Sequence, residues 1–137
     1  MIVDQNHQCF MKVKTYKPKV KGTIYFDLEC RFNKDQIHIV NYAVAYDTNL
    51  DKYFHFSGLD AFFDWIAHID HDDYTFIAHN GASYDFQFVL QYLIRRLHQP
   101  PKTFIVNGSK IVTMVIKIRD ISIRFIDSCS FIARPLA

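Results

Sequence analysis

The chain has 137 residues, a formal net charge of +2 and a hydrophobic fraction of 50%. A chain of this length is expected to form one domain that buries about two thirds of its unfolded surface, without a metal or disulfide to hold it together. The small net charge does not by itself indicate a nucleic-acid partner. No apolar run approaches the ~18 residues of a membrane-spanning helix, so we expect no membrane partner.

The cysteines are odd in number and lack the spacing of a metal site or a disulfide framework, which is typical of a reducing, intracellular compartment. They are Cys9, Cys30 and Cys129.

The polar N-terminus does not resemble a signal peptide. Residues 1–20 are interpreted as a basic arm, which either contacts phosphates or is simply solvated. Its four lysines, together with the one that directly follows it, form one crowded segment: Lys12, Lys14, Lys17, Lys19 and Lys21.

Two acids interrupt an apolar run at residues 24–30, which reads as a strand. Side chains alternate along a strand, so Asp27 and Glu29 share one face, with Cα atoms about 6.5 Å apart. Like charges at this spacing repel each other, and a divalent cation would turn the repulsion into attraction. Hard oxygen ligands suit Mg²⁺ or Mn²⁺. The alternative is a solvated acidic face on an edge strand.

Strands are predicted at residues 22–29, 36–47 and 52–56, joined by polar turns at 31–35 and 49–51. Short connections of this kind indicate an antiparallel meander. The apolar period then changes to that of an amphipathic helix with Asp60 near its start. Its apolar positions are Leu59, Phe62, Phe63, Ile66 and Ile69. The histidines and aspartates of 68–73 match no metal-site spacing, which favours a polar loop.

A short apolar strand at 74–79 leads to a turn at Asn80 and Gly81. A strong helical pattern follows over residues 84–97, which we expect to be capped by Ser83 and stopped by Pro100 and Pro101. Asp85 lies in the first turn of this helix, where the helix dipole alone would favour a negative charge.

The last third of the chain predicts strands at 103–106, 111–118 and 121–127, with a turn at Asn107 and Gly108. The chain then reaches 134–137 without a closing helix. The order of three strands, helix, strand, helix and hairpin predicts an α/β protein with a mixed sheet and flanking helices.

Taken together, two stretches resemble the first two exonuclease motifs of family B DNA polymerases, most of all the protein-primed branch of phages, viruses, linear plasmids and mobile elements. The first is Phe26-Asp27-Leu28-Glu29, and the second is Asn80-Gly81-Ala82-Ser83-Tyr84-Asp85. The segment at 125–131, with Asp127 and Ser128, resembles the Asp-Ser segment that follows the second motif in that branch. The resemblance covers residues 22–136.

The resemblance implies an RNase H-like domain of the DEDD exonuclease type at residues 21–137, incomplete at its C-terminus, that proofreads the single-stranded primer 3′ end of DNA. In such a domain Asp27, Glu29 and Asp85 hold Mg²⁺ or Mn²⁺ for phosphodiester hydrolysis by two ions about 3.5–4 Å apart. The implied DNA-contacting residues are Asn80, Tyr84 and, more loosely, Ser128. The remaining polymerase segment or a terminal protein would be a partner.

The third exonuclease motif of that family and the polymerase motifs do not occur in this sequence. We therefore expect the front part of a polymerase with weak or no nuclease activity as a separate polypeptide. One alternative is a catalytically inactive module that binds single-stranded nucleic acid through Tyr84 and the lysine-rich arm. Another is a stand-alone exonuclease in which Asp127 supplies a missing carboxylate, and a further one is a remnant without a present role.

Overall fold

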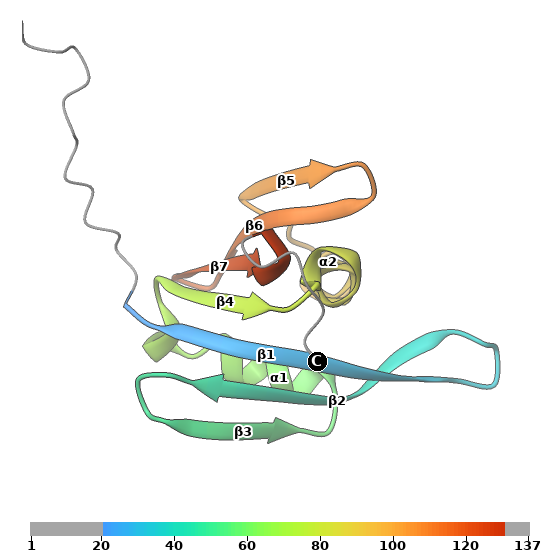
Figure 1. Cartoon of the computed structure of the whole chain (residues 1–137), viewed down its shortest axis with the longest axis horizontal. Helices are drawn as coiled ribbons and strands as arrows, with labels where there is room; N and C mark the ends of the chain where they lie inside the picture. The colour runs from blue at the N-terminus through green and yellow to red at the C-terminus, as the bar shows by residue number, and fades with distance from the viewer. Residues whose placement is uncertain (1–20, 131–137) are drawn as a thin grey trace, which may run out of the picture.

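The computed structural model describes residues 21–130, so the basic arm expected at residues 1–20 and the chain end at 134–137 lie outside the described residues. Seven strands form one sheet in the order β3-β2-β1-β4-β7-β6-β5 (Figure 1). The strands are β1 (Thr23–Phe32), β2 (His38–Asp47), β3 (Lys52–Phe56), β4 (Tyr74–Ala78), β5 (Thr103–Asn107), β6 (Lys110–Ile118) and β7 (Ile121–Asp127). The helices are α1 (Leu59–Ile66) and α2 (Asp85–Arg95).

The direction of each strand follows from the connection that precedes it. Short turns join β1 to β2 and β2 to β3, and both pairs are antiparallel, which confirms the predicted meander. A connection that contains α1 precedes β4 and one that contains α2 precedes β5, whereas a short turn joins β6 to β7. Strands β1, β4 and β7 run parallel to one another. The β5–β6–β7 segment is again antiparallel. This mixed α/β sheet confirms the predicted fold class and is consistent with an RNase H-like fold.

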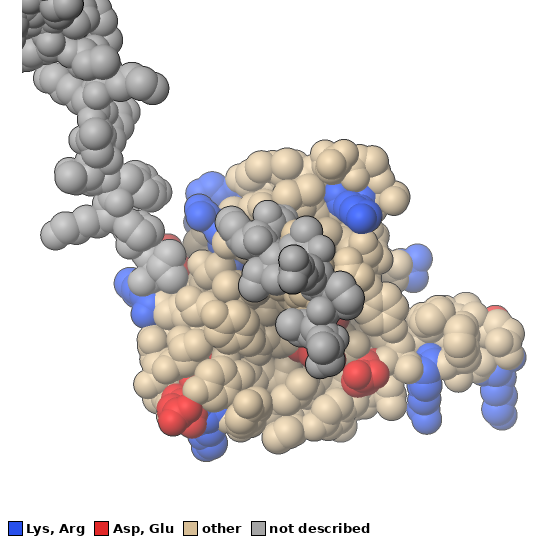
Figure 2. Space-filling model, in the orientation of Figure 1, with Lys and Arg blue, Asp and Glu red and all other residues tan. Residues whose placement is uncertain are grey.

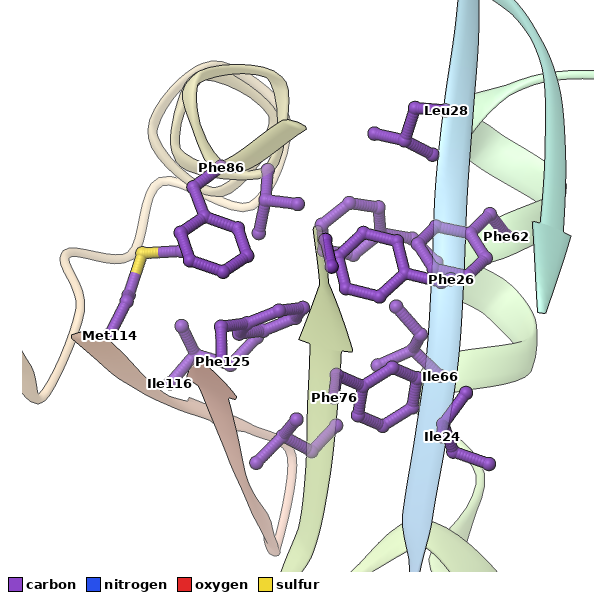
Figure 3. Packing of buried hydrophobic residues seen from close by; sticks show 14 of the residues in the cluster. Ile24, Phe26, Leu28, Phe62, Ile66, Phe76, Phe86, Met114, Ile116 and Phe125 are labelled. Carbon is purple, nitrogen blue, oxygen red and sulfur yellow. The ribbon is translucent and has the colours of Figure 1, made fainter. Parts of the chain in front are cut away.

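Both helices pack against the same face of the sheet, around Phe26 (Figure 3). The ring centroid of Phe26 lies 5.5 Å from that of Phe62 on α1, 6.4 Å from that of Phe86 on α2 and 5.9 Å from that of Phe125 on β7. Each of these side chains is at most 5% exposed. Burying one such aromatic side chain stabilises a fold by about 1.5–3 kcal/mol, so this cluster fixes where β1 lies between the two helices.

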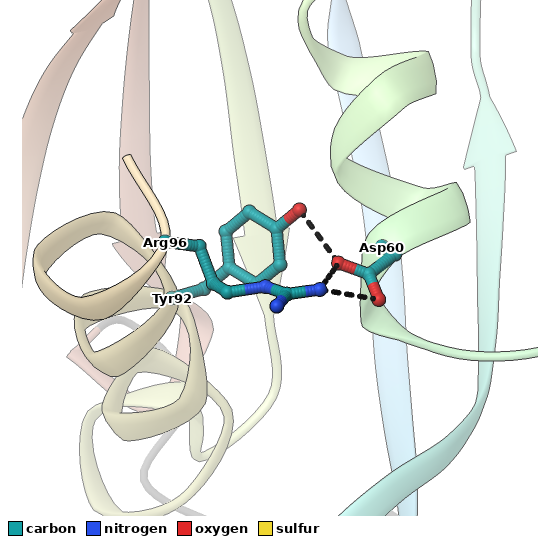
Figure 4. A network of polar contacts seen from close by, with 3 residues as sticks. All are labelled: Asp60, Tyr92 and Arg96. Carbon is teal, nitrogen blue, oxygen red and sulfur yellow. Dashed lines mark hydrogen bonds and ion pairs between the residues drawn. The ribbon is translucent and has the colours of Figure 1, made fainter. Parts of the chain in front are cut away.

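A polar contact also joins the two helices at the surface (Figure 4). Asp60, in the first turn of α1, accepts hydrogen bonds from the Tyr92 hydroxyl at 2.9 Å and from Arg96 Nη2 at 3.1 Å. The Tyr92 hydroxyl and the Arg96 guanidinium lower the pKa of the Asp60 carboxyl. Because the groups are exposed, solvent screens this contact, and it orients the helices more than it stabilises them.

Three predicted details are wrong. Ser83 does not cap α2, because it lies in a 3₁₀ turn at Gly81–Ser83 and Tyr84 is the N-cap residue, with no side-chain cap. Helix α1 ends at Ile66, and a separate 3₁₀ turn follows at Ile69–His71. Strand β1 continues to Phe32, paired with His38, so the turn expected at 31–35 starts later.

Two side chains of the segment 68–73, those of His71 and Asp72, make contacts within the fold. His71 is buried with its ring centroid 4.4 Å from that of Trp65, and burial lowers the pKa of its imidazole. Asp72 Oδ1 accepts a hydrogen bond from the Ser122 N–H at 2.9 Å. In the described part of the chain, no helix has the length and apolar character to cross a membrane.

Candidate functional site

Strand β1 presents two carboxylates on the sheet face opposite the helices. Phe26 and Leu28 are buried against α1 and α2, whereas Asp27 and Glu29 are exposed, as the alternation of the sequence predicts. Directly after Glu29 the pairing with β2 shifts by one residue, because Glu29 pairs with Tyr42 and Cys30 pairs with Val40. Such a bulge bends a strand and increases its twist. The acidic pair therefore lies where β1 changes direction.

The neighbouring strand β4 pairs with β1 only as far as Tyr25, which lies opposite Ile77. The N–H of Leu28 lies beyond this paired segment and would otherwise lack a partner from β4. It donates instead to Asp85 Oδ1, at 3.0 Å, in a buried hydrogen bond between residues 57 positions apart. Asp85 is thereby attached to the one residue that separates Asp27 from Glu29.

A tight turn after β4 carries the chain to this position. Asn80 adopts the left-handed conformation, with φ 59° and ψ 25°, which Asn tolerates better than most residues. Gly81 packs so closely that an added Cβ would lie 2.7 Å from the Phe86 ring and 2.9 Å from Ala78 Cβ. The chain then makes one 3₁₀ turn, and α2 begins with Asp85.

The environment of Asp85 strongly opposes its ionisation. Its side chain is only 2% exposed, and burial raises its pKa from 3.8 to about 7. The negative charges of Asp27 and, to a smaller extent, Asp127 add to this rise, while the Leu28 N–H opposes it.

Asp127 holds the turn after β4 against the end of β7. It is 3% exposed, its Oδ2 accepts a hydrogen bond from the Ala82 N–H at 3.1 Å, and its Oδ1 accepts one from the Cys129 N–H at 2.9 Å. Both oxygens thus bind backbone groups. This geometry assigns Asp127 to supporting the second motif.

The three expected DNA-contacting residues lie around the same end of the sheet. Tyr84 directly precedes Asp85 and is 37% exposed, and the Cys30 thiol, followed by burial, raises the pKa of its hydroxyl to about 12. Asn80 is exposed on the turn. Ser128 is one residue beyond β7, where its Oγ lies 2.8 Å from Nδ1 of His79. Tyr84 is therefore beside the acids, whereas Ser128 follows β7, which β4 separates from β1.

Two of these contacts were not anticipated from the sequence, namely the support by Asp127 and the pairing of His79 with Ser128. A buried acid at the end of an apolar strand is a signal for Asp127, because a carboxylate in that place needs nearby donors. No local sequence pattern predicts the His79–Ser128 contact, because it depends on the parallel pairing of Ala78 with Asp127.

The three acids are suitable ligands for a divalent cation, but their side chains are not placed around one common ion position. Carboxylate oxygens suit Mg²⁺ or Mn²⁺, and a cation beside Asp27 would relieve the repulsion that raises the pKa of Asp85. Among residues 21–130, however, no three His, Cys, Asp or Glu side chains are arranged to hold one ion. Asp85 Oδ1 is directed at the Leu28 N–H rather than toward the open face of the sheet.

Comparison with solved structures shows that this fold occurs in a DNA polymerase. The structures are of Phi29 DNA polymerase: the ternary complex with primer-template DNA and incoming nucleotides, at a TM-score of 0.64, the complex with single-stranded DNA, at 0.65, and the orthorhombic crystal form, at 0.66. Each is 16% identical to this chain over the matched region. At 16% sequence identity, the structural similarity establishes the fold of this chain alone.

Each match covers 83% of this chain and 22% of the polymerase chain, so the chain spans about a fifth of the length of the protein that it is similar to. No family model matches the sequence, and no curated protein matches it.

Proposed function

We propose that this chain is a module of a family B DNA polymerase of the protein-primed kind, the 3′–5′ exonuclease domain that removes mispaired nucleotides from the primer end. The observation that carries the proposal is the hydrogen bond from the Leu28 N–H to Asp85. It joins two motifs that are far apart in the sequence. The fold shared with Phi29 DNA polymerase supports the same conclusion, and that polymerase binds primer-template and single-stranded DNA.

In this proposal Asp27, Glu29 and Asp85 bind two divalent cations, Mg²⁺ or Mn²⁺. When bound, such ions activate water and stabilise the charge that develops during phosphodiester hydrolysis. The exposed carboxylates of Asp27 and Glu29 provide oxygens on the open face of the sheet. Asp85 joins them after losing its proton, which burial and Asp27 make costly below a pH of about 7.

The aromatic and polar residues beside the acids would position the DNA end. Tyr84 offers a partly exposed ring, on which a base can stack with a gain of about 1–3 kcal/mol. Asn80 is exposed on the turn, and the Ser128 hydroxyl lies against His79. Where the described residues are visible in Figure 2, basic side chains lie at the edges of this face.

A second candidate is a module that binds single-stranded nucleic acid without cutting it. The observation that favours it is that residues 21–130 contain no arrangement of three acids or other ligands suited to one metal ion. If the exonuclease proposal is correct, we expect the activity of this polypeptide alone to be weak, because the third exonuclease motif does not occur in its sequence.

The two candidates are separated by one experiment on the full chain. A 5′-labelled single-stranded DNA oligonucleotide is incubated with the protein in Mg²⁺ or Mn²⁺, and binding and shortening from the 3′ end are measured over a range of salt concentrations. The exonuclease proposal predicts binding together with slow, metal-dependent shortening that disappears in Asp27→Ala. Binding without any shortening supports the second candidate, and absence of binding contradicts both.

A matched pair of variants tests the role of Tyr84. We expect Tyr84→Ala to weaken binding of the oligonucleotide and Tyr84→Phe to retain it, because the ring provides the stacking surface. Phe104→Ala on β5 serves as the control, since this residue is 43% exposed but lies four strands away from β1. Equal losses for Tyr84→Ala and Phe104→Ala would place the DNA elsewhere.

A further inference from the structure

The free edge of β5 carries three consecutive exposed apolar residues. All five residues of this strand are exposed, and the side chains of Phe104, Ile105 and Val106 are 43%, 52% and 45% exposed. In the described sheet β5 is the terminal strand and pairs only with β6. An edge strand presents backbone N–H and C=O groups that can pair with another strand. No charged residue and no proline occurs between Thr103 and Asn107.

The opposite edge of the sheet is protected in the usual way. Strand β3 contains Lys52 and His55, and Lys52 Nζ lies 5.1 Å from the centre of the Phe54 ring. Charged side chains on an edge strand discourage further pairing, because a new strand would have to displace or desolvate them. The sheet therefore has one guarded edge and one edge suited to pairing.

The sequence of β5 suits pairing with itself. A two-fold axis perpendicular to the sheet makes an antiparallel pair of identical strands and keeps each residue on its own face. Residues that lie directly opposite each other in this pair are on the same face of the sheet. Because side chains alternate along a strand, the two residue numbers must be both odd or both even. Centring the axis on Ile105 gives the pairs Ile105–Ile105, Phe104–Val106 and Thr103–Asn107, and it uses all five residues of β5.

The flanking charges also favour this register. With the axis at Ile105, Lys102 lies opposite Gly108, so no like charges face each other. Moving the axis to Val106 would place Lys102 opposite Lys110, which is unfavourable. Moving it to Phe104 would pair the apolar Val106 with Lys102. Only the register centred on Ile105 places apolar side chains against apolar side chains on both faces.

We propose that two copies of this chain associate through β5, edge to edge and antiparallel about Ile105, to form one continuous sheet of both chains. The Phe104–Val106 pairs lie on the face of the sheet that carries the helices, and the two Ile105 side chains meet on the other face. In each copy β5 is four strands from β1. At ~4.8 Å per strand, the two acidic sites lie about 43 Å apart on the same face of the combined sheet.

The association state of the full chain tests this directly. Sedimentation equilibrium or light scattering at rising protein concentration should show a monomer–dimer equilibrium. Ile105→Lys should shift it to monomer, because two lysines would meet at the axis. The matched control is Tyr53→Lys on the guarded β3 edge, which should leave the dimer unchanged. A monomer at all concentrations, or equal loss with both variants, overturns the proposal. Urea denaturation of each variant verifies that it remains folded.

Cross-linking tests the register independently of dimer strength. With Cys9, Cys30 and Cys129 replaced by serine, Ile105→Cys alone should form a covalent dimer with a short thiol cross-linker. Thr103→Cys and Asn107→Cys should each fail alone, since identical residues would lie about 13 Å apart along the strands, but a mixture of the two should cross-link. Cross-linking of Thr103→Cys alone would contradict this register. These measurements do not depend on nucleic-acid binding, so the outcome is separate from that of the nuclease proposal.

Discussion

The carboxylate of Asp85 accepts a hydrogen bond from the N–H of Leu28, the residue between Asp27 and Glu29. The contact lies beyond the end of the pairing of β1 with its parallel neighbour, and Asp85 is also the first residue of α2. It also places a third acid, almost fully buried, next to an acidic pair. A fold gains little stability from such a group unless a cation or a proton neutralises it, and this leads to the first prediction.

We expect the stability of the protein to fall as the pH rises from about 4 to about 7, owing to Asp85. Its pKa is 3.8 when unfolded and about 7 when folded, so the native state holds the proton more tightly across this range. The protonated Asp85 carboxyl contributes its full stabilisation below the unfolded pKa of 3.8, and this contribution is lost as the pH rises through the folded pKa of about 7. The loss is on the order of a few kcal/mol, because each pKa unit corresponds to about 1.4 kcal/mol.

The control for this prediction is Asp85→Asn, which keeps an oxygen for the Leu28 N–H but cannot ionise. Urea denaturation at several pH values should show the variant gaining stability relative to the original chain as the pH rises. A constant difference between the two proteins from pH 4 to pH 8 would show that Asp85 does not have a raised pKa.

In contrast to the ionised Asp85, the Asp127 carboxylate is predicted to stabilise the fold, because it accepts two backbone hydrogen bonds. Asp127→Ala would leave the N–H groups of Ala82 and Cys129 without their acceptor. Each lost acceptor costs about 1–3 kcal/mol, so we expect a total loss of about 2–6 kcal/mol in urea denaturation. Asp127→Asn keeps one acceptor oxygen and should lose less. If Asp127→Asn instead abolished metal-dependent cutting with little change in stability, Asp127 would belong to the catalytic site.

The turn that positions Asp85 should be sensitive to one added methyl group. Gly81→Ala would place Cβ 2.7 Å from the Phe86 ring, and such overpacking costs about 1–3 kcal/mol. Gly58→Ala is the control, because its Cβ would meet only Val40 O at 3.8 Å and its backbone is extended. We expect Gly58→Ala to be neutral or slightly stabilising. Similar denaturation midpoints for the two variants would contradict the close packing at Gly81.

The strands were predictable because their signals are local. Alternation of apolar and polar residues located β1, β2 and β3, and turn residues such as Asn107 and Gly108 located the hairpin at β5 and β6. Errors occurred where a local pattern has two structural solutions. Apolar residues three apart fit both an α-helix and a 3₁₀ turn, which is why α1 was expected to continue to Ile69.

The site was less predictable because it depends on contacts between distant segments. The residues alone explain Asp85 by the helix dipole, and only the resemblance to polymerases suggested that it meets Asp27 and Glu29. Its burial, and the resulting rise in its pKa, follow from how α2 packs beside β1. Ser83 illustrates the same limit, since a suitable capping residue is present but the backbone of the 3₁₀ turn places Tyr84 at the N-cap.

The raised pKa of Asp85 also predicts how metal affinity depends on pH. Binding of Mg²⁺ or Mn²⁺ at Asp27, Glu29 and Asp85 requires that Asp85 lose its proton, so affinity should increase between pH 6 and pH 8. Titration calorimetry should also show a proton released on binding near pH 6. In Asp85→Asn both the pH dependence and the proton release should disappear, and Asp27→Asn should weaken binding at every pH. Binding of equal strength at pH 6 and pH 8 would show that Asp85 does not ligate the metal.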